Sequence, residues 1–391
     1  MAENTDNKEK QPQLMSRRSF LQKSALMGAA FLAASSVIPQ ETEAKGRNRA
    51  NKSGHMNISG RRTLGSGSAA LTVSALGFGC MGMNYNRSVS PSRKECIKVI
   101  REAVERGVTL FDTAIIYGPL INEELVGEAL APYKGQVAVT TKFGHEVING
   151  KATGRQNSRP EIIRRYSEES LRRLRVDCLE MFYQHRLDRN VPIEEVAGTI
   201  GDLIKEGKVK RWGVCEVSAD TIRRAHAVTP LTAVQSEYHL MFRDVETNGV
   251  LDACRELSIG FVPYSPMNRG FLGGAINEYT RFDPNNDNRQ TLPRFSPENI
   301  RLNTRIVNEL QEFGRRRGMT SAQVALAWLL AKAPFIVPIP GTTKLAHLEE
   351  NLRAADMPLS AADVRELESA VGRFPVVGDR YPAEQQRQVQ S

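Results

Sequence analysis

The stretch that decides the fold is GVTLFDTAIIYGPLINEELVGEALAPYKGQVAVTTKFG, residues 107–144. It begins with a short β-branched run at Thr109–Asp112, continues through an amphipathic pattern at Glu123–Ala131, and ends in a second run at Val137–Thr141. Gly107 marks the joint before the first run. A strand, a helix and a second strand in this order predict two parallel strands joined by a helical crossover.

The same alternation continues from residue 75 onward. The strand candidates are Ala75–Gly79, Thr109–Asp112, Val137–Thr141, Leu179–Tyr183, Lys210–Val214, Ala233–Ser236, Gly260–Pro263 and Ile336–Ile339. The amphipathic stretches between them are Arg93–Arg106, Glu123–Ala131, Pro160–Leu174, Ile193–Glu206, Ala219–Ala227 and Val245–Glu256. Eight strands with intervening helices predict an α/β fold, a single-domain (β/α)8 TIM barrel, with reactive groups at the carboxyl ends of its strands.

Two segments depart from this rhythm. Thr63–Ser74 alternates weakly in polarity around glycines. This pattern predicts an N-terminal β-hairpin that closes the bottom of the barrel, at the amino-terminal ends of its strands. Tyr264–Arg301 has little periodicity and predicts a long loop above the barrel mouth. We therefore expect a barrel with extra helices at residues 61–375, a basic flexible linker at 45–60, and a polar C-terminal tail at 376–391.

The N-terminus has the pattern of an export signal. Residues 16–23 read SRRSFLQK, and an apolar run at Ala25–Ile38 follows directly. This order is typical of a twin-arginine (Tat) signal peptide, here residues 1–44, and the apolar run is shorter than the ~20 residues of a membrane span. We expect the Tat machinery to export the folded protein to the periplasm. Cleavage after Ala44 would leave no membrane span, whereas an uncleaved signal would tether the protein.

Charge and cysteine usage exclude several classes of function. The formal net charge is +9, of which six charges are basic side chains in residues 45–62 while residues 1–44 are neutral overall. A nearly balanced body without a basic stripe argues against a nucleic-acid partner. The five cysteines are widely spaced, and the histidines show no metal-ligand spacing. We therefore expect free thiols and no metal site.

The glycine motif GFGCMG, residues 77–82, matches the pattern G-x-G-x-x-G after a strand. In a Rossmann fold this motif opens a helix and is followed by an acidic residue about 20 positions later. Here a loop-like sequence follows, and the first candidate acid is Asp112. We therefore reject the Rossmann fold and expect a loop whose backbone closely approaches a ligand.

Four reactive side chains fall at or just after predicted strand ends. Asp112 ends the second strand and is followed by Tyr117, while Lys142 and His185 end the third and fourth strands. The Lys142 ammonium can lower the pKa of the Tyr117 phenol, and Asp112 can hold that lysine in place. His185 can orient a substrate carbonyl. Each residue alone has a structural alternative, such as an ion pair or a rim aromatic, but the four together predict a general-acid site.

In its motifs the chain resembles the aldo-keto reductase superfamily over residues 61–372. The motifs are FDTA at 111–114 with Tyr117-Gly118, NEELVG at 122–127, TK at 141–142, YQHR at 183–186, IKEGKV at 204–209, AVQSEY at 233–238, YSPMNRG at 264–270 and IPGTTK at 339–344. The resemblance implies an NADP-dependent oxidoreductase that reduces an aldehyde or ketone to an alcohol. Tyr117 would be its general acid, with Asp112, Lys142 and His185 completing a catalytic tetrad.

The resemblance also implies the contacts to NADP(H). Gln235 would bind the nicotinamide carboxamide, Tyr264 would stack under the ring, and Ser265–Gly270 would lie along the pyrophosphate. Gly341–Lys344 would meet the ribose 2′-phosphate and so favour NADPH over NADH, with Glu350-Asn351 at the adenine. The full implied set is Met81, Asp112, Arg186, Cys215, Gln235, Tyr264, Ser265, Pro266, Met267, Gly270, Gly341, Thr342, Thr343, Lys344, His347, Glu350 and Asn351.

Some positions depart from the family pattern. His347 stands where some relatives carry Arg, and Cys215 where many carry Ser, a change that would add redox sensitivity. Ile115 and Ile116 replace a commonly polar stretch and indicate a hydrophobic substrate. A second hypothesis is a cofactor-binding regulatory subunit, because residues 237–242 are similar to that branch of the superfamily. The intact tetrad favours the enzyme. A third hypothesis, a dehydratase or isomerase of the same fold, is disfavoured by the complete cofactor motif.

Overall fold

The structure is a computed structural model that describes residues 57–87 and 90–389. The expected twin-arginine signal and residues 45–56 of the expected linker lie outside the described residues, as do residues 390–391. Among the described residues, no helix is both long enough and apolar enough to cross a membrane.

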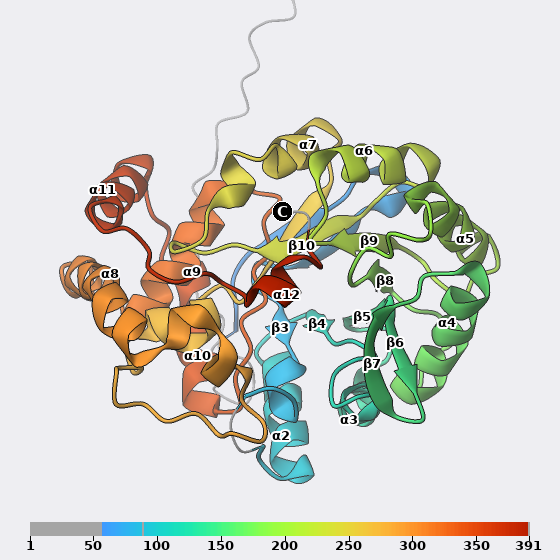
Figure 1. Cartoon of the computed structure of the whole chain (residues 1–391), viewed down its shortest axis with the longest axis horizontal. Helices are drawn as coiled ribbons and strands as arrows, with labels where there is room; N and C mark the ends of the chain where they lie inside the picture. The colour runs from blue at the N-terminus through green and yellow to red at the C-terminus, as the bar shows by residue number, and fades with distance from the viewer. Residues whose placement is uncertain (1–56, 88–89, 390–391) are drawn as a thin grey trace, which may run out of the picture. The chain divides into compact units, whose positions relative to one another are not determined.

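The parallel α/β barrel that the sequence predicts is present and nearly closed (Figure 1), with seven strands in its sheet where the sequence predicts eight. Each strand pairs with its neighbours in the order in which the barrel strands follow one another along the chain. They are β3 (Phe78–Gly79), β4 (Leu110–Asp112), β5 (Ala138–Phe143), β8 (Met181–Gln184), β9 (Trp212–Cys215), β10 (Ala233–Glu237) and β11 (Gly260–Tyr264).

Residues 336–340 fill the gap between the first and last of these strands, where the sequence predicts an eighth strand. The N–H groups of Val337 and Ile339 donate to the carbonyl oxygens of Phe261 and Pro263 on β11, at 2.9 and 3.1 Å. The carbonyl oxygens of Pro338 and Pro340 accept from the N–H groups of Gly77 and Gly79, at 2.9 and 3.2 Å. Proline has no N–H to donate, so the prolines serve this strand only as acceptors.

The helices surround the strands (Figure 1), and their apolar residues explain why. In α5 the buried residues Ile193, Val196, Ala197, Ile200 and Leu203 recur at the spacing of one helix face, which packs against the barrel. The helices are α2 (Arg93–Glu105), α3 (Ile121–Leu130), α4 (Pro160–Leu174), α5 (Ile193–Lys205), α6 (Ala219–Val228), α7 (Val250–Glu256), α8 (Pro297–Arg315), α9 (Ser321–Lys332), α10 (Leu345–Arg353), α11 (Ala361–Gly372) and α12 (Ala383–Gln386).

The expected N-terminal hairpin is present as β1 (Arg61–Leu64) and β2 (Leu71–Ser74), which pair antiparallel. Leu64, Leu71 and Val73 of this hairpin are buried in one cluster with barrel residues such as Met181. The hairpin thereby seals the amino-terminal end of the barrel, so that a ligand can enter only from the opposite end.

Three local expectations differ from the structure. The helix expected at Val245–Glu256 begins only at Val250, because Gly249 has a positive φ of 84° and separates it from a short 3-10 turn. The long loop after β11 contains 3-10 turns and ends where α8 begins at Pro297. A second hairpin, β6 (His145–Ile148) with β7 (Lys151–Gln156), was not expected and follows β5 directly.

Candidate active site

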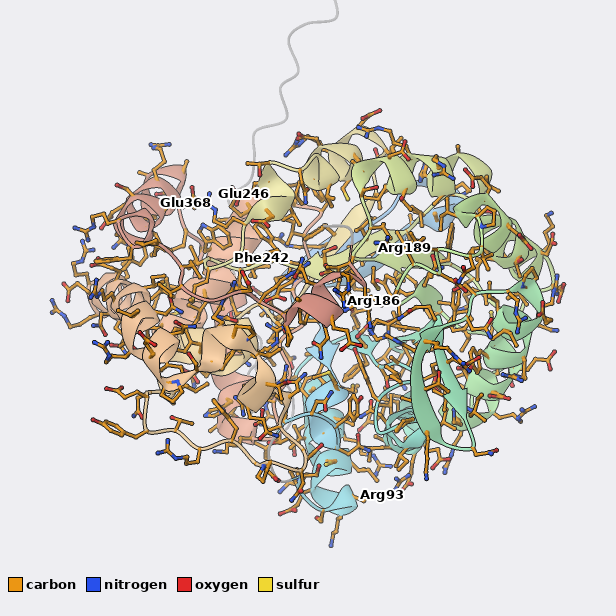
Figure 2. The ribbon with its side chains drawn as sticks, in the orientation of Figure 1. Arg93, Arg186, Arg189, Phe242, Glu246 and Glu368 are labelled. Carbon is orange, nitrogen blue, oxygen red and sulfur yellow. The ribbon has the colours of Figure 1, made fainter. Side chains whose placement is uncertain are left out.

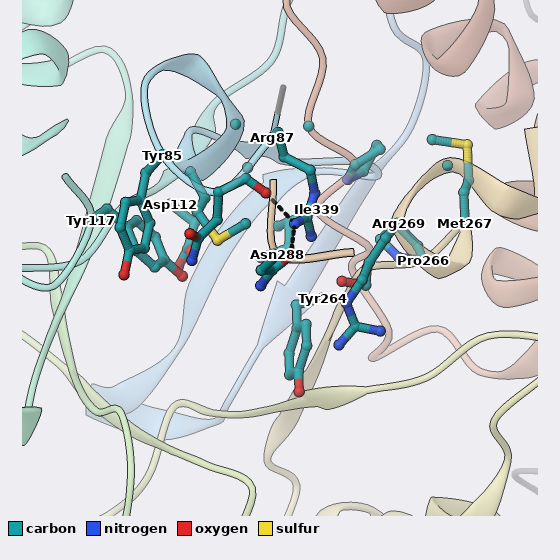
Figure 3. A pocket seen from close by; sticks show the side chains of 18 of the residues that line it. Tyr85, Arg87, Asp112, Tyr117, Tyr264, Pro266, Met267, Arg269, Asn288 and Ile339 are labelled. Carbon is teal, nitrogen blue, oxygen red and sulfur yellow. Dashed lines mark hydrogen bonds between the residues drawn. The ribbon is translucent and has the colours of Figure 1, made fainter. Parts of the chain in front are cut away.

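A cavity of about 890 Å³ lies at the carboxyl ends of the barrel strands. Asp112, Cys215 and Gln235 reach it from the ends of β4 and β9 and from β10. Figure 3 shows Asp112 and Tyr117 close together at one side of this cavity and Tyr264 at another. Ligands bind at this end of such barrels because the strand ends and their loops converge there.

The four residues predicted to carry the chemistry come together at the cavity floor. The Lys142 ammonium forms an ion pair with Asp112 and donates to the Thr113 carbonyl oxygen at 2.8 Å and to Tyr117 Oη at 3.4 Å. His185 follows β8, and its ring lies edge-on to the Tyr117 ring with centroids 5.7 Å apart. Lys142 lies inside β5 rather than after it, because that strand extends to Phe143.

Asp112 is fixed by several donors besides the lysine. Its Oδ2 accepts from Thr140 Oγ1 at 2.8 Å and from Gln235 Nε2 at 3.0 Å. Both Asp112 and Lys142 are buried. A buried carboxylate with this many donors holds the lysine in one position, so the ammonium stays directed at the Tyr117 oxygen.

Burial and neighbouring charges compete to set the pKa values of Tyr117 and Lys142 at the cavity floor. Burial raises the pKa of Tyr117 to about 12, and the opposing effect of the Lys142 charge is smaller. As expected, the Lys142 ammonium lowers the pKa of Tyr117, but removing the phenol from water raises that pKa by more, so the net shift is upward. Burial alone would lower the pKa of Lys142, but the adjacent Asp112 carboxylate raises it above its usual value.

Burial also keeps His185 neutral. It is the first cause of a pKa well below the usual value, followed by the nearby His145, Lys142 and Arg186. His185 Nδ1 is buried and has no hydrogen-bond partner within the described part of the chain. A neutral imidazole offers one N–H donor and one acceptor, so this ring can bind a neutral oxygen in the cavity.

All of the residues implied as cofactor contacts line this one cavity. The strand-end group is Met81, Asp112, Arg186, Cys215, Gln235 and Tyr264. The loop group is Ser265, Pro266, Met267, Gly270, Gly341, Thr342, Thr343, Lys344, His347, Glu350 and Asn351. Together they form a continuous wall, from the floor along the loop after β11 to α10, which we call the cofactor wall.

Close backbone packing shapes the start of this wall. A Cβ added at Gly79 would lie 2.8 Å from the Ile339 carbonyl oxygen, and one at Gly341 would lie 2.5 Å from the Gly79 carbonyl oxygen. Glycine at these positions lets β3 and the segment after Ile339 approach each other beside the cavity. The GFGCMG motif therefore serves barrel closure as well as the approach to a ligand, because Gly79 and Gly82 also line the cavity.

The loop after β11 is held in an unusual conformation. Ser265, Asn268 and Arg269 have positive φ values of 50°, 45° and 54°, which cost energy in residues other than glycine. Buried Arg269 donates to both carboxylate oxygens of buried Glu237, at 2.9 and 3.0 Å. This bidentate pair holds the strained loop against β10.

The chain is similar over most of its length to proteins of one family. The chain matches the Aldo/keto reductase family over residues 75–371. The chain belongs to the aldo-keto reductase family. It is 43% identical over 317 residues to "Probable aldo-keto reductase 1" of Glycine max, covering 81% of this chain and 90% of that protein.

Solved structures show the same fold. The glycerol dehydrogenase of Gluconobacter oxydans has a TM-score of 0.72 at 25% identity, covering 81% of this chain and 97% of that one. A thermostable aldo-keto reductase solved with the inhibitor epalrestat has a TM-score of 0.64 at 25% identity, covering 80% of this chain and all of that one. The chain is thus an oxidoreductase of a family that uses a nicotinamide cofactor.

Sequence reasoning missed the C-terminal segment of this aldo-keto reductase, which was expected as a polar tail from residue 376. Arg380 is buried and donates to both carboxylate oxygens of Glu216, at 2.7 and 3.3 Å. The next residue, Tyr381, lies with its hydroxyl 2.8 Å from that of Tyr264. Figure 1 shows α12 in front of the barrel strands, and Figure 2 labels Arg186 in the same region of the view; Arg186 and Gln385 of α12 both line the cavity. No local sequence pattern reveals these contacts.

Arg87 was also missed. It lines the cavity and donates to the Asn86 carbonyl oxygen and to Asn288 Oδ1, both at 2.6 Å (Figure 3). No carboxylate within the described ranges 57–87 and 90–389 forms an ion pair with it. Burial and the charges of Arg269 and Arg289 lower the pKa of Arg87 to about 9. The Asp287 carboxylate acts on this pKa in the opposite direction without forming an ion pair with Arg87. A cation that lines the cavity and bonds only neutral oxygens is suited to an anionic ligand.

The structure changes the interpretation of two departures from the family pattern. Ile115 is fully buried in the core, and only Ile116 lines the cavity, so the indication of a hydrophobic substrate loses one of its two residues. Burial raises the pKa of Cys215 to about 12. The suggested redox sensitivity has no support from that thiol, because a protonated, buried thiol is a poor nucleophile.

Proposed function

We propose that this aldo-keto reductase uses NADPH to reduce an aldehyde or ketone to an alcohol, with Tyr117 as the general acid. The observation that carries the proposal is the position of Tyr117 Oη, 3.4 Å from Lys142 Nζ, at the inner end of the cofactor wall. A proton donor there is next to any carbonyl oxygen bound at the floor.

The chain's own residues account for the proton. Tyr117, whose pKa is raised, remains protonated at neutral pH and can donate its hydroxyl proton to the substrate oxygen. Lys142 then stabilises the phenolate, and Asp112 keeps the ammonium in place. His185 donates a hydrogen bond to the carbonyl oxygen and so orients it. The nicotinamide, when bound, supplies the hydride.

The cavity fits an anionic dinucleotide. Lys344 caps the nine-residue helix α10, and Thr342 and Thr343 precede it on the cavity wall. A lysine, two hydroxyls and the N–H groups of a helix N-terminus form a suitable environment for the 2′-phosphate. Arg87, which lines the same cavity, would supply a further cation for the phosphates. We therefore expect NADPH to bind more tightly than NADH, with exposed His347 contributing less than an arginine would.

Export remains part of the proposal. A twin-arginine signal suits a protein that loads its cofactor in the cytoplasm and crosses the membrane folded. We expect residues 1–44 to export a folded reporter protein to the periplasm, and Arg17→Lys/Arg18→Lys to abolish that export. A reporter that remains cytoplasmic with the intact signal would overturn this part.

The second candidate function is a cofactor-binding sensor with incidental turnover. The observation that favours it is the C-terminal segment, which the Arg380–Glu216 pair holds beside Tyr264 and which would slow cofactor release. Against it, the Glu237–Phe242 motif lies largely in the interior, where Glu237 and His239 pair with each other at 2.9 Å. Buried residues cannot serve as a docking surface for a partner protein.

The deciding experiment is NADPH consumption by residues 45–391 with a panel of aldehydes and ketones. Tyr117→Phe should lower turnover by about 10²-fold or more while NADPH binding persists, because only the proton donor is removed. Tyr133→Phe is the matched control, since Tyr133 bonds Glu105 on the outside of the barrel. Tight NADPH binding without turnover in the wild type would favour the sensor, and no binding would overturn both.

A further inference from the structure

The unexpected hairpin places a second histidine beside His185. β6 begins at His145, directly after Gly144, whose positive φ of 109° turns the chain at the end of β5. The Asn157 N–H donates to the Gly144 carbonyl oxygen at 2.7 Å, and the Val147 N–H donates to Tyr166 Oη at 3.0 Å. These contacts anchor the hairpin to the barrel, so His145 is held in place.

His145 and His185 form one pair at the cavity. Their rings meet edge-on with centroids 4.9 Å apart, and both rings line the cavity together with Tyr117. Burial, followed by the charge of Arg186, lowers the pKa of His145 to about 3, so this ring is neutral at physiological pH. No hydrogen bond to the His145 side chain is found within the described part of the chain.

The proposed reaction uses only one of these two imidazoles. A carbonyl oxygen between Tyr117 and His185 would lie about 3 Å from each donor. A substituent on the neighbouring carbon would then lie within reach of His145, because the two imidazole rings are in contact. An imidazole with a free donor and a free acceptor gains a hydrogen bond only if that substituent carries an oxygen.

Other groups on this side of the cavity are polar but already occupied. The Glu146 carboxylate accepts from Asn157 at 3.0 Å and from Arg155 at 2.8 and 3.0 Å. Gln156 reaches Gln388 of the C-terminal segment at 3.5 Å. Arg155 pairs with the Glu146 carboxylate, and the Arg186 guanidinium donates to the His185 carbonyl oxygen at 2.7 Å. The neutral ring of His145, by contrast, has no hydrogen bond among the described residues and lies next to His185.

We propose that His145 is a specificity-determining residue that selects carbonyl substrates with a hydroxyl group on the adjacent carbon. The proposal rests on the carbonyl reductase activity proposed above and names the substrate class of that site. His145 hydrogen-bonds the α-hydroxyl while Tyr117 and His185 hold the carbonyl oxygen. His145 takes no part in the proton transfer.

The test compares two ketones of nearly equal size, hydroxyacetone and butan-2-one, with NADPH. The wild type should favour hydroxyacetone in kcat/KM by about tenfold, the equivalent of one net hydrogen bond. His145→Phe should abolish that preference by lowering only the hydroxyacetone value. His145→Gln, which keeps a donor and an acceptor, should retain most of it.

A binding measurement separates failure of this inference from failure of the proposed function. Propane-1,2-diol and butan-2-ol, the two corresponding alcohols, are titrated calorimetrically into the wild-type enzyme with NADP+ and into His145→Phe. Tighter diol binding that depends on His145 supports the inference even if turnover is absent. Equal binding of the two alcohols overturns it, as does a preference that His145→Phe leaves unchanged. Equal loss of activity on both ketones would show a merely structural role.

Discussion

The cavity has two walls that differ in origin. The cofactor wall is built on strand ends, the loop after β11 and the start of α10, all of which belong to the barrel repeat. The opposite side, which we call the substrate wall, is built from residues 145–154 of the β6–β7 hairpin and from residues 381–388 of the C-terminal segment. The difference teaches that the proposed chemistry and cofactor binding rest on residues of the barrel, while the proposed substrate selection rests on segments added to it.

Both walls adjoin the cavity floor, where Lys142 contacts Tyr117. A substitution there should therefore have the largest effect on turnover. Lys142→Met should lower turnover by about 10²- to 10⁴-fold, because Tyr117 loses the charge that stabilises its phenolate. The variant should also be less stable, since Asp112 is left buried without its cation. NADPH oxidation and denaturant unfolding measure the two effects.

A double variant separates these effects. Asp112→Asn/Lys142→Met removes the buried charge together with its partner, so it should regain stability without regaining turnover. Recovered turnover in the double variant would mean that Lys142 acts only as a structural ion pair.

The next test concerns the buried ion pair between Arg380 and Glu216, which holds the C-terminal segment beside Tyr264 of the cofactor wall. Arg380→Met should lower the free energy of unfolding by about 3 kcal/mol, because Glu216 loses its bidentate partner in a buried site. The loss should free Tyr381 from Tyr264 and speed NADPH dissociation, measured by stopped-flow fluorescence. If stability and dissociation both stay at wild-type values, the C-terminal segment is not held by this pair.

A substitution of Lys344 in the cofactor wall should weaken NADPH binding without changing the substrate wall. Lys344→Met should raise the Kd for NADPH about tenfold and leave the Kd for NADH unchanged, since only the 2′-phosphate loses a charge-assisted partner. Fluorescence titration of both nucleotides measures this. Equal weakening of both nucleotides would place Lys344 away from the 2′-phosphate.

The smallest expected effect is the change in the rate of reduction with pH. The pKa of Tyr117 is raised to about 12, so this acid stays protonated as the pH rises through the neutral range. Reduction with saturating NADPH should therefore vary less than about twofold between pH 6 and pH 9, and should fall only as the pH approaches that pKa. A tenfold loss per pH unit above pH 7 would contradict the assignment of the acid.

The comparison of the walls also explains what the sequence could predict. The barrel strands and the positions of the tetrad follow from local periodicity and from reactive residues at strand ends, whereas the residues of the cofactor wall follow only from the resemblance to the aldo-keto reductase superfamily. The sequence does contain a signal for the β6–β7 hairpin. Asn149-Gly150, with positive φ values of 51° and 71°, is a typical two-residue hairpin turn. Recognising it would have pointed to His145.

Other features have no local signal. Arg380 and Tyr381 lie in a polar stretch, and only the folded chain brings them to Glu216 and Tyr264. The raised pKa of Tyr117 depends on how completely the floor is buried, which the order of residues does not reveal. Tertiary contacts and burial therefore account for most of what was missed.

The measurement that tests the central claim most directly is the transfer of deuterium. Residues 45–391 are incubated with NADPH deuterated at the transferable C4 position and with hydroxyacetone, and the product is analysed by NMR. The account predicts propane-1,2-diol that carries deuterium on the former carbonyl carbon in the wild type, and at least about 10²-fold less of it with Tyr117→Phe. Diol without deuterium, or oxidised cofactor without diol, would contradict it.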